Sequence, residues 1–132
     1  MTRYVIDGPA VIQLARDGVA VPEHHRLVAP NVLRSDALAL LYGAVRRGEI
    51  SSELGRKLLD RVATTKIRLL GDRGSRDTAW RLAEQFGWDD TTGAEYIAVA
   101  RLQADALIAL DPELERRARG VVPIASITEL YP

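Results

Sequence analysis

The chain of 132 residues has no cysteine and no long apolar run, and each absence narrows what it can be. Without cysteine, disulfide bonds, thiol catalysis and cysteine-ligated zinc are excluded. No apolar stretch reaches the length of a membrane span, and the first residues contain no apolar core of a signal peptide. We therefore expect a soluble, cytoplasmic protein without a membrane partner.

The chain also has few aromatic residues, no net charge and almost no lysine. Eighteen basic residues balance 18 acidic ones, so no overall field attracts nucleic acid or membrane, and self-association near neutral pH is favoured. Only Lys57 and Lys66 are lysines, and the other basic residues are arginines. Arginine suits phosphate and carboxylate partners. An arginine excess also follows from GC-rich coding, so it does not by itself indicate a ligand.

What is present is an alternation of short apolar runs with helical patterns. The runs predict strands at 3–6, 26–29, 67–70, 106–110 and 121–124. Apolar residues at helical spacing predict helices at about 9–17, 31–46, 52–63, 75–86, 92–103 and 112–118. This alternation is typical of an α/β three-layer sandwich with a central, mostly parallel sheet flanked by helices. We expect a single domain over residues 1–132, which is long enough to bury a core.

Two of the predicted strands end in an aspartate. Asp7 follows the apolar run at 4–6 and precedes Gly-Pro, and Asp111 follows the run at 106–110 and precedes a proline. If the strands are parallel neighbours, both carboxylates reach the crevice at the carboxyl edge of the sheet, where ligands of open α/β sheets bind. The alternative is that each aspartate only caps the helix that follows it.

Other acids have similarly open interpretations. Asp36 stands at the head of an apolar helical run, where it needs a cation or a hydrogen-bond donor or is favoured by the helix dipole. Asp89 and Asp90 precede a helix and are suited to capping it. Glu95, within that helix, fits a solvent-facing position.

The order of these segments resembles that of PIN-domain ribonucleases, and more narrowly that of VapC-type toxins of bacterial toxin–antitoxin pairs. The resemblance extends over essentially the whole chain. It rests on Tyr-Val-Ile-Asp at 4–7, Leu-Arg-Ser-Asp at 33–36, Ala-Glu-Tyr-Ile-Ala at 94–98 and the run at 102–108 that leads to Asp111. It implies a PIN-like fold in which carboxylates surround one or two Mg²⁺ or Mn²⁺ ions, and an endoribonuclease activity on RNA.

Elementary chemistry explains why such a site needs a cation. Two carboxylates about 5 Å apart repel by roughly 3 kcal/mol at an effective dielectric of 20. Oxygen ligands with several retained waters suit Mg²⁺ or Mn²⁺. The resemblance places Asp7 first, Asp36 second and Asp111 last among the metal-binding, catalytic acids.

The chain departs from the family pattern at three positions. Asp36 stands where the family usually has a glutamate, one methylene longer. Gly93 occupies the position of the family's third acid, and Ala109 replaces a common threonine or serine. Glu95 lies about 200° around the helix from Gly93 and faces away, which leaves Asp90, one turn earlier, as a weak candidate for the missing metal ligand.

Three functions follow from these observations. The first is a metal-dependent endoribonuclease, the toxin of a toxin–antitoxin pair. The second is a PIN domain that cuts weakly or not at all and binds RNA or protein. The third, a receiver-like or nucleotide-binding domain, lacks a phosphate-binding glycine loop and a suitably placed acceptor aspartate. The resemblance also implies a homodimer and a small antitoxin, and RNA would be held by rim arginines chosen from Arg46, Arg47, Arg68, Arg73 and Arg76.

Overall fold

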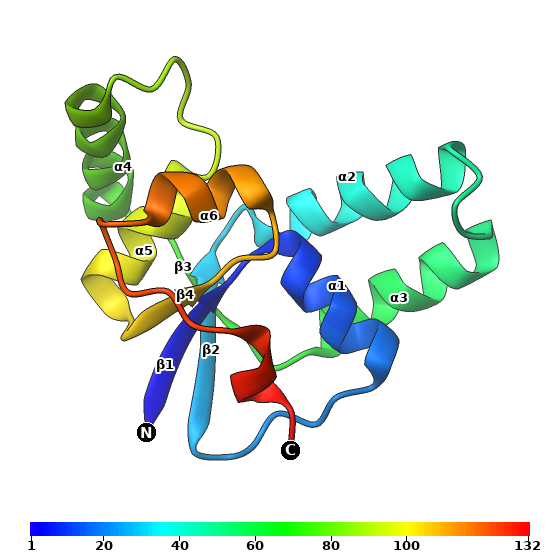
Figure 1. Ribbon diagram of the computed structural model, residues 1–132. Helices are drawn as coiled ribbons and strands as arrows, with labels where there is room; N and C mark the ends of the chain where they lie inside the picture. The colour runs from blue at the N-terminus through cyan, green and yellow to red at the C-terminus, as the bar shows by residue number, and fades with distance from the viewer.

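The computed structural model describes residues 1–132 and has a four-stranded sheet at its centre (Figure 1). The strands are β1 (Thr2–Ile6), β2 (His25–Pro30), β3 (Arg68–Leu70) and β4 (Ala106–Ile108). Their order in the sheet is β3-β2-β1-β4, and every pairing is parallel. The predicted parallel α/β sheet is therefore confirmed.

Six α-helices and one 3₁₀ helix flank the sheet. α1 (Gly8–Asp17), α2 (Leu33–Arg46) and α3 (Ser52–Thr64) pack on one another on one side (Figure 1). α4 (Arg73–Phe86) packs on α5 (Ala94–Gln103), which contacts β1, β2 and β4 from the other side. α6 (Pro112–Ala118) and the 3₁₀ helix η1 (Ile127–Leu130) complete the chain. None of these helices is long and apolar enough to cross a membrane.

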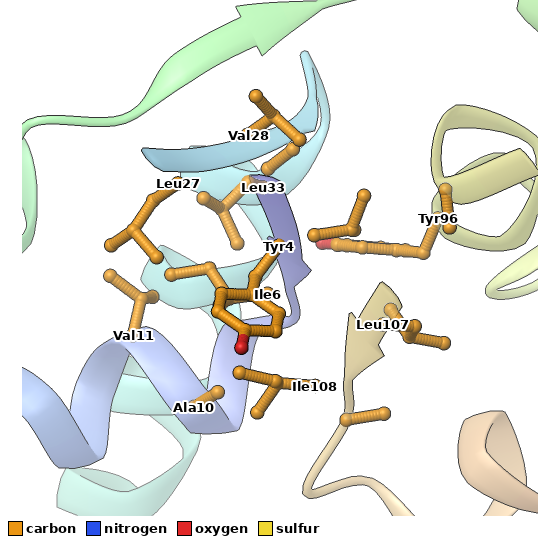
Figure 2. Close-up of a cluster of buried hydrophobic side chains, with 14 of the residues drawn as sticks. Tyr4, Ile6, Ala10, Val11, Leu27, Val28, Leu33, Tyr96, Leu107 and Ile108 are labelled. Carbon is orange, nitrogen blue, oxygen red and sulfur yellow. The ribbon is translucent and has the colours of Figure 1, made fainter. Parts of the chain in front are cut away.

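Burial of both sheet faces explains why the strands are apolar throughout. Tyr4 and Ile6 lie on the face near Ala10 of α1, while Leu107 of β4 lies on the opposite face beside Tyr96 of α5 (Figure 2). All five belong to the main core, a cluster of 28 buried residues. The core thus spans both layers and fixes the strand ends from which the candidate acids extend.

Most predicted elements are confirmed, but three boundaries differ for clear reasons. α4 begins at Arg73 rather than 75, because the Asp72 side chain accepts from the Ser75 N–H and the Ser75 hydroxyl accepts from the Asp72 N–H. α5 begins only at Ala94, because Gly93 has a left-handed φ of +78°. β4 ends at Ile108, because the N–H groups of residues 110 and 111 turn towards the Asp7 carboxylate.

The predicted strand at 121–124 is wrong. Residues 119–121 form a turn in which Gly120 has a φ of +80°, and only Ile124 pairs with the sheet, as an isolated parallel bridge to Leu107. Pro123 interrupts the strand because it has no N–H to donate, although its carbonyl accepts from the Leu107 N–H. The apolar run therefore reflects the burial of Val122 and not the strand pairing that it was expected to indicate.

Candidate acidic site

The sheet has a point at which the chain reverses its direction of winding. From β1 the chain passes through α1 to β2 and β3 on one side, whereas β4 pairs with the other side of β1. This is the topological switch point of the sheet, and in open parallel sheets ligands bind there, outside the carboxyl ends of the strands. Asp7 directly follows β1, and Asp111 lies three residues after the last residue of β4. The two strand-end aspartates therefore flank the switch point.

Asp7 is buried, with 2% of its surface exposed, and both of its carboxylate oxygens accept hydrogen bonds. Oδ1 accepts from the Ala10 N–H at 3.0 Å, which caps α1, and Oδ2 accepts from the N–H groups of Leu110 at 3.0 Å and Asp111 at 2.9 Å. Burial raises the pKa of Asp7; these N–H donors oppose the rise, and the nearby charge of Asp111 adds to it. Asp7 thus joins β1, α1 and the segment after β4 while keeping a costly charge in the site.

Asp36, on the first turn of α2, is held by a tyrosine from the opposite helical layer. The Tyr96 hydroxyl donates to Asp36 Oδ2 at 2.6 Å. Burial raises the pKa of Tyr96, and the hydrogen bond to Asp36 and the charges of Asp36, Asp7 and Glu95 raise it further. The phenol therefore stays protonated and remains a donor to Asp36 over the whole working pH range.

Asp111 caps α6 and also faces the same pocket as the other two acids. Its Oδ2 accepts from the Leu114 N–H at 3.3 Å. Asp7, Asp36 and Asp111 line one pocket of about 320 Å³, together with Gly8, Pro9, Ala39, Leu40, Thr92, Gly93, Tyr96 and Leu114. Three acids that are far apart in the sequence thus line one pocket. The strand-end pattern predicts this proximity for Asp7 and Asp111, and the resemblance predicts it for Asp36.

Two glycines shape the walls of this pocket. A Cβ on Gly8 would lie 2.9 Å from Leu40 Cδ1 and 3.7 Å from Asp36 Cβ, so glycine lets the start of α1 approach the start of α2. A Cβ on Gly93 would lie 2.9 Å from Leu114 Cδ1. The space beside Gly93, where the PIN-domain pattern that the sequence resembles has a carboxylate, is therefore occupied by a leucine side chain from α6.

Asp90 does not line the pocket. Its Oδ1 lies 2.9 Å from Arg117 Nη1 and accepts from the Thr92 N–H at 3.1 Å. The hydrogen bond from Arg117 holds the pKa of Asp90 below its usual range. Arg117 in turn lies 5.0 Å over the Trp88 ring and pairs with Glu113. Asp90 therefore stabilises the loop before α5 and does not contribute a carboxylate to the acidic pocket.

The pocket suits the divalent ion that the resemblance implies in the chemical type of its donors, but not in the spacing of three acids. No group of three or more Asp, Glu or His side chains is spaced to hold a metal ion. The oxygen-only donor set nevertheless suits Mg²⁺, which is commonly held by one or two carboxylates with several retained waters. Hydrogen bonds occupy Oδ2 of Asp36 and of Asp111 and leave the second oxygen of each without a protein donor. The donor set therefore fits the ion by chemical type.

The arginines expected at the rim separate into two groups. Arg73 and Arg76 lie on the first turns of α4, which starts from the carboxyl end of β3, and they share a surface hollow with Asp77 and the 65% exposed Trp80. The other three lie elsewhere: Arg46 and Arg47 at the far end of α2, and Arg68 at the start of β3. Arg47 is paired with Glu49.

Sequence reasoning did not assign the groups that position the acids. In the sequence, Tyr96 is only one member of the 94–98 pattern, and its partner Asp36 lies 60 residues earlier in the chain. The N–H donors to Asp7 from residues 110 and 111 carry no side-chain signal at all. A buried tyrosine in an apolar helix is itself a weak signal, since its hydroxyl needs a partner.

Comparison with known proteins gives a similar fold. No family model matches the chain, and no curated protein matches it. Among solved structures, the crystal structure of PAE2754 from Pyrobaculum aerophilum superposes with a TM-score of 0.74 at 22% sequence identity. The match covers 98% of this chain and 92% of that one. At this identity the similarity concerns the fold.

Proposed function

We propose that the protein is a PIN-domain endoribonuclease that depends on Mg²⁺ or Mn²⁺ and acts as the toxin of a toxin–antitoxin pair. The observation that carries the proposal is the convergence of Asp7, Asp36 and Asp111 on one pocket at the switch point of a parallel sheet. The order of segments that resembles PIN-domain toxins supports the same class of reaction. Each acid comes from a different part of the chain, so their meeting is a property of the fold.

In this proposal one or two of the three aspartates bind the ion directly and the remainder contact it through its retained water molecules, while other groups position the aspartates. A bound divalent ion would lower the pKa of a water molecule and stabilise negative charge on the phosphodiester. Three backbone N–H groups fix the orientation of Asp7. Tyr96 fixes Asp36, and the capping bond to Leu114 N–H fixes Asp111. The negative pocket would repel RNA phosphates until the ion neutralises it.

RNA would then be held outside the acidic pocket, on α4. Trp80 is 65% exposed and shares a hollow with Arg73 and Arg76. An exposed aromatic ring between arginines suits single-stranded nucleic acid, because bases stack on the ring and cations neutralise the phosphates. Trp80→Ala should weaken RNA binding without changing the affinity for Mn²⁺.

The test is cleavage of a structured RNA with and without Mg²⁺ or Mn²⁺. Asp36→Asn is preferred to a substitution of Asp7, because Asp36 is only half-buried and carries fewer structural hydrogen bonds. We expect Asp36→Asn to lower the cleavage rate at least about 100-fold, since it removes a metal-binding charge. Asp60→Asn, an exposed position on α3, is the control with the same charge change. A cleavage rate that is the same with and without the metal ion, or the same in Asp36→Asn and Asp60→Asn, would count against a metal-dependent nuclease.

Gly93 favours a second candidate, a PIN domain that binds RNA or protein but cuts weakly or not at all. A single Gly93→Asp change is a poor test, because the new Cβ would contact Leu114 Cδ1 at 2.9 Å. The double variant Gly93→Asp/Leu114→Val removes that atom, and aspartate tolerates the left-handed region better than most residues. A large gain in cleavage over Leu114→Val alone would support loss of the third acid; RNA binding with no gain would favour a binding module.

The proposed partners, a second copy of the chain or a small antitoxin, have a suitable surface between α2 and α3. An apolar groove of about 340 Å³ lies there, lined by residues that include Leu38, Tyr42 and Leu59. Leu38 is 52% exposed and Tyr42 is 64% exposed, which is unusual for side chains of this kind on neighbouring turns of one helix. Leu38→Glu should reduce the mass measured by light scattering if a second copy covers this groove.

A further inference from the structure

A second pocket, at the opposite end of the sheet from the acids, is strongly basic. It has a volume of about 440 Å³, and its lining residues include Arg3, Arg26, Lys66 and Arg68. The wall contains no acidic residue; its other members are Met1, His25, Leu27, Val28, Ile67, Leu70 and Gln103. Four cations thus converge at the amino ends of the strands, about one strand length from the acidic pocket.

The pairing of the strands places the three arginines on one face of the sheet. Arg3 and Arg26 are register partners on β1 and β2, and Arg68 is the partner of Val28, two residues after Arg26. Register partners in a parallel sheet point to the same face, as do residues two apart. Like charges in directly opposed cross-strand positions are unfavourable. All three arginines are solvent-exposed, so water screens their mutual repulsion in the free protein, and an anion placed among them would be attracted by each of them.

The protein leaves the side chains of these four cations without ion pairs. None of the four cations is in an ion pair with a carboxylate. The nearby Asp105 carboxylate accepts from the backbone N–H of Arg3, and Arg26 donates only to a backbone carbonyl, at 3.5 Å. His25, also in the wall, has a buried Nδ1 with no hydrogen-bond partner. By contrast, Arg116 and Arg117 of α6, and Arg119 directly after it, are each paired with a glutamate.

The other part of the wall is apolar. Ile67 and Leu70 are half-buried and contribute carbon surface beside the charged groups. A volume of about 440 Å³ lies within the usual range of small-ligand sites, roughly 300–1,000 Å³. Arginine forks match phosphate oxygens in two-point contacts, and the apolar wall suits a base or sugar.

We propose that this pocket binds a phosphate-bearing ligand of nucleotide size, with the phosphate on Arg3, Arg26 and Arg68. The ligand is a free nucleotide or the phosphorylated end of an RNA strand, since both offer the same group. The site is separate from the acidic pocket, and the proposal does not depend on nuclease activity.

Isothermal titration calorimetry at low ionic strength, with EDTA present to keep divalent ions from the acidic pocket, tests this proposal. The probes are adenosine 5′-monophosphate, adenosine, and short RNAs with a 5′-phosphate or a 5′-hydroxyl. We expect the monophosphate to bind and adenosine not to bind. Arg26→Gln should weaken binding about tenfold or more, because one two-point phosphate contact is lost. Tight binding of only the 5′-phosphorylated RNA assigns the site to RNA ends, whereas tight binding of only the mononucleotide assigns it to a free nucleotide.

Arg16→Gln is the matched control, because Arg16 is an exposed, unpaired arginine on α1 outside this pocket. It should bind the ligand within twofold of the wild type. Thermal unfolding gives a second measurement: the monophosphate should raise the midpoint of Arg16→Gln and not that of Arg26→Gln. Equal affinity in the two variants, or equal binding of adenosine and its monophosphate, would overturn the proposal. Retained binding in Asp36→Asn separates this site from the acidic one.

Discussion

The contact between Tyr96 and Asp36 gives a prediction whose size follows from the structure. Tyr96→Phe removes one hydroxyl and leaves the ring, which is 4% exposed, in its place in the core. The deleted hydrogen bond, at 2.6 Å, is the link between α5 and the first turn of α2. The change in the free energy of unfolding on losing this bond measures how much one polar contact contributes to the packing of the two helical layers.

A hydrogen bond to a charged group contributes about 1.5–3 kcal/mol to stability. Asp36 is half-buried, so water replaces part of the lost bond, and we expect the lower end of that range, about 1.5 kcal/mol. For 132 residues the entropy of unfolding is about 280 cal/mol/K, at roughly 2.1 cal/mol/K per residue. The midpoint of thermal unfolding should therefore fall by about 5 °C.

A double-mutant cycle with Tyr96→Phe and Asp36→Ala, followed by urea unfolding, isolates this contact. We expect a coupling energy of about 1–2 kcal/mol. Tyr42→Phe is the control, because the Tyr42 side chain is 64% exposed, and it should change stability by less than about 0.5 kcal/mol. A coupling energy below about 0.3 kcal/mol would refute the idea that Tyr96 holds Asp36.

Three further predictions concern the surroundings of the pocket. Burial raises the pKa of Asp7, so the folded state holds this proton more tightly than the unfolded chain does. The free energy of unfolding of the wild type, relative to Asp7→Asn, should therefore fall as pH rises from about 4 through the raised pKa; a relative rise in urea unfolding would contradict this sign. Gly93→Ala should destabilise by about 1–3 kcal/mol more than Gly18→Ala in the same assay, because both positions have φ above +50° but only the former meets a side chain. Equal losses would mean that the neighbouring leucine moves freely. Arg117→Met should lower the free energy of unfolding by about 2 kcal/mol, because the Arg117 side chain is 12% exposed and pairs with two carboxylates. Arg116→Met should lower it by less than about 0.5 kcal/mol, because the Arg116 side chain is 72% exposed. Similar thermal midpoints for these two variants would contradict the structural role of Arg117.

The layers of the fold could be predicted from the sequence because both faces of the sheet are buried. Such strands are apolar throughout, and amphipathic helices alternate with them, which leaves few other architectures. The errors arise where a polar contact or a proline overrides the apolar pattern. The run at 121–124 is apolar, but a turn at Gly120 and the missing N–H of Pro123 leave only Ile124 paired. The spacing of apolar residues does not indicate where a turn or a missing N–H ends strand pairing.

The site could be predicted in part. The aspartates at the ends of the first and fourth strands meet because parallel neighbours end at the same edge, which the sequence order implies. The ion pair of Asp90 could not be predicted, because its partner Arg117 lies 27 residues further along the chain, on α6. The occupation of the space beside Gly93 depends on Leu114 in the same way.

For Asp7 and Asp111, capping a helix and facing the pocket are not alternatives. Asp7 caps α1 through Oδ1 and lines the pocket, and Asp111 caps α6 through Oδ2 and lines it too. A carboxylate has about four lone-pair sites, so one cap leaves capacity for a ligand. Substitution of either aspartate therefore removes a structural bond together with any metal-binding role, and loss of activity alone cannot separate the two. Asp36 accepts no capping hydrogen bond from α2. Its one structural bond, from the Tyr96 hydroxyl, can still be accepted by the amide oxygen of Asp36→Asn. Loss of cleavage in this variant at an unchanged thermal midpoint is therefore the most direct measurement of metal-dependent chemistry in this pocket.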